Sequence, residues 1–209
     1  MELCTDTLKI IVPLILIFVQ IPFFVVFEQK KPKPRDLMPI AVLSVIGALG
    51  RVSFAAIPSF NPNSAIVIIT GMQFGPLAGF LTGSLSALAS NMLLGQGPWT
   101  LWQMTAWGMT GCLAGVFTRR GFFARRFVLY IFGFTVSIFF GWFMNLQYLL
   151  GYVNPLTWTA VVASCASSLT FDLAHGWSTF LFLLLLERPW GKKLGRLRRK
   201  YGVLEGRRD

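Results

Sequence analysis

The sequence predicts an all-α polytopic membrane protein, with a six-helix core and a further N-terminal transmembrane helix. Two features of its composition lead there: 55% of the 209 residues are hydrophobic and only 13% are charged, whereas a soluble domain carries about 25% charged residues. A third is that the apolar residues form long continuous runs. Because backbone polar groups in a bilayer must be paired within helices or a closed barrel, such runs favour helices.

Seven apolar runs define the expected elements. The first covers residues 7–27 and is long enough to span a bilayer, with a helix lying in the interface as the alternative. The core runs follow at residues 37–57, 64–72, 77–94, 100–118, 127–150 and 159–186. Residues 64–72 are too few for a straight span, so we expect neighbouring helices to shield them. The chain thus divides into an N-terminal helix and basic loop (1–36), a membrane core (37–186) and a basic tail (187–209).

Positive charge is confined to three short stretches. Residues 28–36, 119–126 and 187–209 hold all of the 19 Lys and Arg except Lys9 and Arg51. The positive-inside rule places these stretches in the cytoplasm and the uncharged loops at 58–63, 95–99 and 151–158 outside. We therefore expect a cytoplasmic C-terminus and an external N-terminus. The net charge of +11 is interpreted as a topology signal, with lipid or partner contact by the tail as a further role, and not as nucleic-acid binding.

Several chemistries find no support in the sequence. The first residues have neither the basic region nor the cleavage site of a secretory signal. Cys4, Cys112 and Cys165 are scattered and form no CxxC pattern, so we expect neither a disulfide framework nor a metal site. The chain has no Walker A, GxSxG or HExxH motif. We expect no catalytic residues and no cofactor in this chain.

Asp172 and His175 are an ionisable pair in the middle of the last apolar run. Their spacing of three residues places them on one helix face. An ionisable group at membrane depth is a functional hypothesis by default, because its burial is costly. Two roles are open: contact with a substrate, or a hydrogen-bonded pair that holds helices together. Arg51, also within a span, is a possible partner for Asp172.

The three uncharged loops share a mixture of amide and aromatic side chains. Trp99, Gln103 and Trp107 follow one another at intervals of four, so they lie on one helical face, with Trp102 beside it. These rings are either interfacial belt residues or the wall of a pocket for an organic ligand. The candidate substrate-binding residues are Asn61, Asn91, Gln96, Trp99, Trp102, Gln103, Asn145, Tyr148, Tyr152, Trp158, Asp172 and His175.

One region resembles a known family. RVSFAAIPSFNPNSAIVI, the short run before FGPLAGFLTG, and GQGPWTLWQM, all within residues 47–115, resemble the S components (substrate-binding subunits) of energy-coupling factor (ECF) transporters, most closely the cobalamin-type group. The resemblance implies a non-enzymatic six-helix subunit that captures a vitamin from outside. It also implies docking on a membrane coupling subunit that works with two ATPases, where ATP and magnesium bind, followed by toppling and release inside.

Family members dock through a small-xxx-small motif on the first core helix. Ser44 and Ala48 match that spacing here, and small side chains allow close helix approach; ordinary internal packing is the alternative. We therefore expect a binding subunit of an ECF-type importer for cobalamin or a related corrinoid. The rival hypotheses are an S component for another vitamin, an intramembrane enzyme using Asp172 and His175, and a scaffold subunit without ligand.

Overall fold

The computed structural model describes the backbone of residues 2–202 and the side chains of residues 11–202. Over this range the regular elements are seven α-helices and one 3-10 helix. They are α1 (Glu2–Gln29), α2 (Pro34–Ser53), α3 (Asn63–Phe74), α4 (Pro76–Leu94), α5 (Trp99–Arg119), η1 (Phe122–Ala124), α6 (Arg126–Tyr152) and α7 (Trp158–Tyr201).

Five of these helices are long and apolar enough to cross a membrane: α2, α4, α6, α7 and the part of α1 from Ile11 to Gln29. The fold class predicted from the sequence, an all-α polytopic membrane protein, is therefore confirmed. The 12-residue α3 is apolar but short, as expected. Helix α5 is not among the five, although it has 21 residues, because Thr, Gln and Gly interrupt its apolar residues.

Helix α3 forms the centre of the bundle. Its residues Ala65, Ile66, Val67, Ile68 and Ile69 are all at most 2% exposed, so this short helix is covered on every side. Helix α3 is too short to reach across a bilayer, but the surrounding protein shields it from lipid and from water. This enclosure explains how so short a helix can lie within the membrane core.

Glycines bring α4 and α5 into backbone contact. A Cβ atom on Gly79 would collide with the carbonyl of Gly111, and one on Gly111 would collide with the carbonyl of Gly79. Membrane helices associate largely through such close packing, because lipid supplies no hydrophobic drive to bring them together. The small residues of α4 are therefore an internal packing surface.

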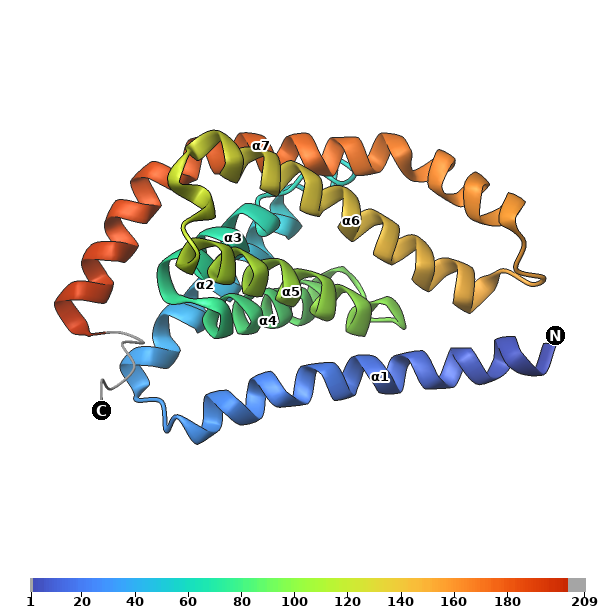
Figure 1. The fold of residues 1–209 in the computed structure, drawn as a ribbon, viewed down its shortest axis with the longest axis horizontal. Helices are drawn as coiled ribbons and strands as arrows, with labels where there is room; N and C mark the ends of the chain where they lie inside the picture. The colour runs from blue at the N-terminus through green and yellow to red at the C-terminus, as the bar shows by residue number, and fades with distance from the viewer. Residues whose placement is uncertain (1, 203–209) are drawn as a thin grey trace.

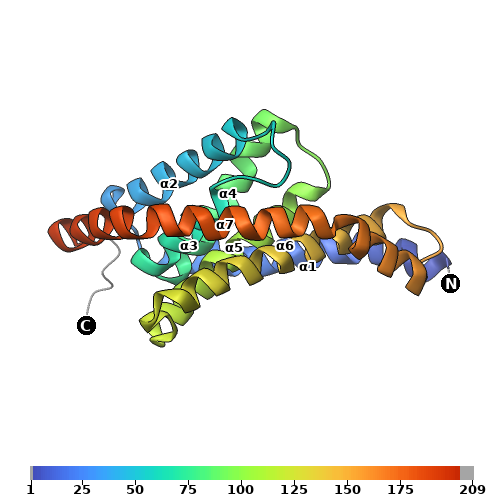
Figure 2. The same ribbon diagram turned by 90° about the horizontal axis from the view of Figure 1, so that it is seen from above.

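The basic and uncharged connections lie toward opposite ends of the molecule. Figure 1 shows the α1–α2 turn, the α5–α6 connection and the red end of α7 at the left, and the α4–α5 and α6–α7 connections toward the right. The segregation agrees with the predicted topology, and which end faces the cytoplasm stays a prediction. Figure 2 shows α7 running across the whole bundle, with α2 on one side and α6 on the other.

Helix α7 continues far beyond the expected end of the last span. It has 44 residues and includes most of the predicted basic tail. Pro189 lies inside it, and the red end of the ribbon bends away from the orange part (Figure 1), as a proline in a helix interior predicts. Arg198 fastens this extension by donating from Nη1 to the carbonyl of Gln73 at 2.9 Å.

Helix α1 lies along α4 and α5. Gln20, only 5% exposed, donates from Nε2 to Thr105 Oγ1 at 3.1 Å and to the carbonyl of Leu101 at 3.4 Å. The ring of Phe23 stacks on Phe80 with 3.7 Å between centroids. A polar anchor and an aromatic contact thus attach the apolar part of this helix to the core.

Candidate functional site

A polar network lies inside the apolar bundle and begins at Arg51, near the C-terminal end of α2. Its Nη1 atom donates to Ser90 Oγ at 2.8 Å and to Asn91 Oδ1 at 2.7 Å, both on α4. The guanidinium carbon also lies 4.9 Å from the centroid of the Trp107 ring on α5, within the range of a cation–π contact. Arg51 therefore joins three helices.

The turn between α4 and α5 extends this network. Asn91 Nδ2 donates to Thr100 Oγ1 at 3.1 Å and to Gln103 Oε1 at 2.9 Å. Thr100 in turn donates to Gln96 Oε1 at 2.8 Å. The chain reverses at Gly95, whose φ of 112° favours glycine, and this reversal places the end of α4 against the start of α5. Asn91, Gln96 and Gln103, predicted from the sequence as site residues, are thus brought together.

Trp107 links the network to the opposite side of the bundle. Its indole Nε1 donates to Ser64 Oγ on α3 at 2.9 Å, and Ser64 Oγ lies 2.8 Å from His175 Nε2 on α7. The His175 ring meets Phe140 of α6 edge-on at 5.1 Å. His175 is 5% exposed and Ser64 2%, so this chain of contacts lies within the protein interior.

Asp172 belongs to a separate cluster between α6 and α7. Its Oδ2 accepts from Ser168 at 2.9 Å, and Asn145 Nδ2 donates to the same serine at 2.6 Å. Asp172 and His175 share a helix face, as predicted, but have different partners. The possible pairing of Arg51 with Asp172 is wrong: along residues 11–202 no carboxylate pairs with Arg51, because its contacts run to α4 and α5.

Asn63 has a side chain without partners beside the network. It is fully buried, and neither its Oδ1 nor its Nδ2 atom has a hydrogen-bond partner. A Cβ on Gly47 would meet the Asn63 amide, and next would meet Ser86. Gly47 lies one helical turn before Arg51 on α2, and Ser86 lies one turn before Ser90 on α4. Asn63 therefore lies between the same two helices as the Arg51 guanidinium, one helical turn further into the bundle. A buried amide without partners is costly, so its presence needs an explanation.

The remaining predicted residues have varied surroundings. Trp102 is 4% exposed and packs on Phe143, so it is a helix-packing residue. The ring of Trp99 covers Gly97. Asn61 Oδ1 accepts from the backbone N–H of Asn63 at the start of α3, and its own backbone N–H and carbonyl bond to Ser178.

Three aromatic residues lie apart from the network, at the far end of the α6–α7 hairpin. Tyr148 and Tyr152 stack on each other and are 52% and 60% exposed. Trp158 is 83% exposed. A role for these rings in substrate binding stays a prediction.

The predicted docking pair lies on the inner face of α2. Ser44 and Ala48 are each 3% exposed, and Ser44 Oγ donates to the carbonyl of Thr82 on α4 at 3.3 Å. Internal packing, the alternative considered for this motif, describes their position here. Their docking role stays a prediction.

Sequence reasoning missed several members of the network. Ser64, Ser90 and Thr100 are small hydroxyl residues with no distinguishing spacing. Asn63 lies at the end of the uncharged loop at residues 58–63 and was not among the candidate residues. Arg51 did carry a signal, a cation within an apolar run, but we assigned it the wrong partner. Within the described part of the chain, no group of three or more His, Cys, Asp or Glu is placed to hold a metal ion.

Most of the chain, including the helices that carry the polar network, matches a known protein family. Residues 35–187 match the model of the family described as ECF transporter, substrate-specific component. The chain belongs to this family. Its members are substrate-binding components of transporters and not enzymes, and they work with a membrane coupling subunit and ATPases. The match leaves all of α1 outside it, and also the C-terminal extension of α7.

The individual proteins that match this chain have low sequence identity to it. UPF0397 proteins of Vibrio atlanticus and Aliivibrio fischeri are each 25% identical to this S component over 88 residues, which is 40% of this chain and 48% of theirs. A UPF0397 protein of Aliivibrio salmonicida is equally similar. The match spans about half the length of these curated relatives. No solved structure matches the chain.

Proposed function

We propose that this S component captures a small organic substrate on the outer side of the membrane and delivers it inward while docked on a coupling subunit driven by ATPases. The observation that carries the proposal is the buried network from Arg51 through Asn91 and Trp107 to His175. Polar side chains converging among aromatic rings suit a ligand that needs both orientation and apolar contact.

The network also suggests which groups a substrate presents. Arg51 supplies positive charge that, among the described side chains, no carboxylate neutralises, and buried charges are normally paired. Asn63 adds an amide with a free donor and a free acceptor. Substrate oxygens such as those of a carboxylate or carboxamide would satisfy Arg51, and a mixed donor and acceptor group would satisfy Asn63.

The narrower proposal is that the substrate is a corrinoid. Carboxamide side chains around a corrin ring would offer acceptors to Arg51 and mixed partners to Asn91 and Gln103. The exposed rings of Tyr152 and Trp158 provide apolar surface for so large a ligand. Asn91, Thr100 and Gln103 bond to one another in this structure, so a corrinoid would have to open the α4–α5 turn.

A second candidate is a smaller vitamin with a carboxylate. The specific observation that favours it is the guanidinium of Arg51, which lies against Trp107 and has no acidic partner among the side chains of residues 11–202. A carboxylate would form a charge-assisted contact there. A small ligand would also require less rearrangement of the polar network.

Calorimetry of the detergent-purified protein with a vitamin panel tests the proposal. The panel includes cobalamin, cobinamide, and vitamins with and without a carboxylate. We expect one-to-one binding of one ligand class, and its loss in Arg51→Met. Arg120→Met, which removes an exposed cation outside the network, should bind as the wild type does. Absence of binding across the panel by demonstrably folded protein would refute a substrate-capturing role for these ligands.

A further inference from the structure

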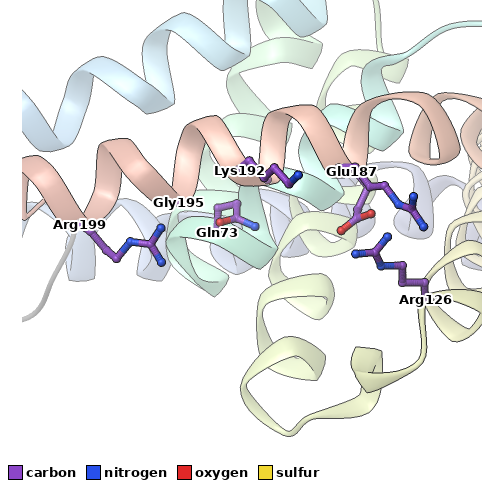
Figure 3. A pocket seen from close by; sticks show the side chains of 8 residues that line it. Gln73, Arg126, Glu187, Lys192, Gly195 and Arg199 are labelled. Atoms are coloured by element: carbon purple, nitrogen blue, oxygen red, sulfur yellow. The ribbon is translucent and has the colours of Figure 1, made fainter.

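A second polar site lies at the opposite end of the bundle from the α4–α5 turn. It is a cavity of about 560 Å³ between the end of α3, the start of α6 and the extension of α7. Its lining residues are Gln73, Arg126, Glu187, Arg188, Gly191, Lys192, Gly195 and Arg199. Figure 3 shows Arg126 and Glu187 pointing toward each other, with Arg199 further along α7 and Gln73 of α3 beside that part of the helix.

The cavity has a strong excess of positive charge. It combines four cationic side chains with one carboxylate. Arg126, Lys192 and Arg199 are exposed, so their charges are available to a ligand. Within residues 11–202, the hydrogen bond that fastens the α7 extension to Gln73 comes from Arg198, which is not among the lining residues. The four cations are therefore not needed for that attachment.

Two glycines on α7 keep the space open. Gly191 and Gly195 are one turn apart, so they lie on the same face of the helix. A Cβ on either would reach the side-chain amide of Gln73, at 3.4 Å and 3.3 Å. Larger residues would fill the floor of the cavity. The shape thus depends on the sequence of the extension, which the family match does not include.

Glu187 contributes an acceptor without a donor. Its Oε2 atom is buried and has no hydrogen-bond partner. A ligand that carries only negative charge would leave this oxygen unsatisfied, at a cost in free energy. A phosphate group joined to a hydroxyl or ammonium donor would satisfy both the cations and Glu187.

The position of the cavity favours a lipid as the source of the phosphate. Arg126 begins the candidate membrane span of α6, and Glu187 directly follows the apolar run at residues 159–186. Both residues are therefore expected near the level of the lipid headgroups. Phe127 directly follows Arg126, and Leu185 lies one helical turn before Arg188 of the cavity lining. These two apolar side chains are 67% and 65% exposed, so apolar surface adjoins the charged one. Basic pockets at helix ends are known binding sites for anionic headgroups.

The geometry points to this cavity as a binding site for the phosphodiester of a phospholipid whose headgroup carries a hydrogen-bond donor, in the leaflet on the side of the basic loops. The lipid would brace the α7 extension against α3 and α6. This site is independent of the transported substrate and lies at the other end of the molecule from the α4–α5 turn.

Native mass spectrometry of the delipidated full-length protein tests this assignment. Phosphatidylglycerol and phosphatidylethanolamine should bind more tightly than phosphatidylcholine, which has no headgroup donor. The variant Arg126→Gln/Arg199→Gln should bind phosphatidylglycerol on the order of tenfold or more weakly, since each cation near a membrane surface contributes about a fivefold factor. The control Arg35→Gln/Arg120→Gln loses the same charge from exposed positions outside the cavity and should bind normally.

A steric variant separates a shaped site from general attraction to basic surface. Gly195→Leu keeps every cation but fills the cavity floor, so it should weaken phosphatidylglycerol binding as the double Arg variant does. If inorganic phosphate or glycerol 3-phosphate displaces the lipid, the cavity is still a phosphate-binding site, but its ligand is a soluble compound and not a lipid. Equal lipid binding by the wild type, the double Arg variant and Gly195→Leu, all folded by circular dichroism, would overturn the proposal.

Discussion

Ser64 Oγ lies 2.8 Å from His175 Nε2, and this contact joins the central helix α3 to the middle of α7. The same hydroxyl accepts a hydrogen bond from the indole of Trp107 on α5. One serine therefore satisfies polar groups from two other helices in the interior of an apolar bundle. Because water is not available there to replace it, the contact has consequences for both stability and binding.

Ser64→Ala should destabilise the protein. The substitution leaves Trp107 Nε1 and His175 Nε2 without their partner, and each unsatisfied buried group costs about 1–3 kcal/mol. The measurement is thermal unfolding in detergent. Ser167→Ala provides the control, since Ser167 is exposed and bonds only to the carbonyl of Ser164 on its own helix. Equal midpoints for the two variants would mean that the link contributes nothing.

Asn63→Leu should separate binding from stability. Leucine has nearly the shape of asparagine, and Asn63 has no partner to lose, so we expect unchanged or slightly raised thermal stability. If the amide is held for a substrate, the same variant should bind substrate at least about tenfold more weakly, which corresponds to one lost hydrogen bond of about 1.4 kcal/mol. Calorimetry with the ligand found in the vitamin panel measures this. Unchanged affinity would remove Asn63 from the proposed site.

The arrangement of the helices could largely be predicted from the sequence, since apolar runs and clustered charges are local signals. The runs at residues 64–72 and 77–94 correspond to α3 and α4 within a few residues. The length of α7 could not be predicted in this way. Its charged C-terminal part resembles a solvated tail, but the helix continues because Trp190 and Leu194 pack against the core, which is a tertiary effect.

The site was predictable only in part. Asn91 and Gln103 stood out as amides beside tryptophans, and they do bond to each other. The link from Trp107 through Ser64 to His175 joins positions 43 and 111 residues apart, and no spacing in the sequence encodes it. Asp172 and His175 looked like a pair because they share a face, yet their partners lie on different helices.

Gly79→Ala should destabilise the contact between α4 and α5. The added methyl group would collide with the Gly111 carbonyl, and a backbone atom cannot rotate away as a side chain can. Overpacking of this kind costs about 1–3 kcal/mol, which should exceed the gain in helix propensity of up to about 1 kcal/mol from replacing glycine.

Gly151→Ala is the matched control for that experiment. The nearest atom to its added Cβ is Gln147 Nε2 at 3.7 Å, an ordinary contact, so only the propensity term remains. Thermal unfolding should therefore show a lower midpoint for Gly79→Ala than for Gly151→Ala. The reverse order would show that α4 and α5 can separate at little cost.

Gln20→Leu should weaken the attachment of α1 without affecting its insertion. The variant removes the donor to Thr105 and Leu101 but keeps the helix apolar. Hydrogen bonds between membrane helices contribute about 0.6 kcal/mol on average and up to about 1.7, so we expect a loss of that size in unfolding experiments in mixed micelles. Gln29→Leu changes an exposed glutamine at the end of the same helix and should have no such effect. If the two variants unfold alike, packing contacts such as Phe23 on Phe80 hold α1 in place. Gln20 then orients the helix without adding to its stability.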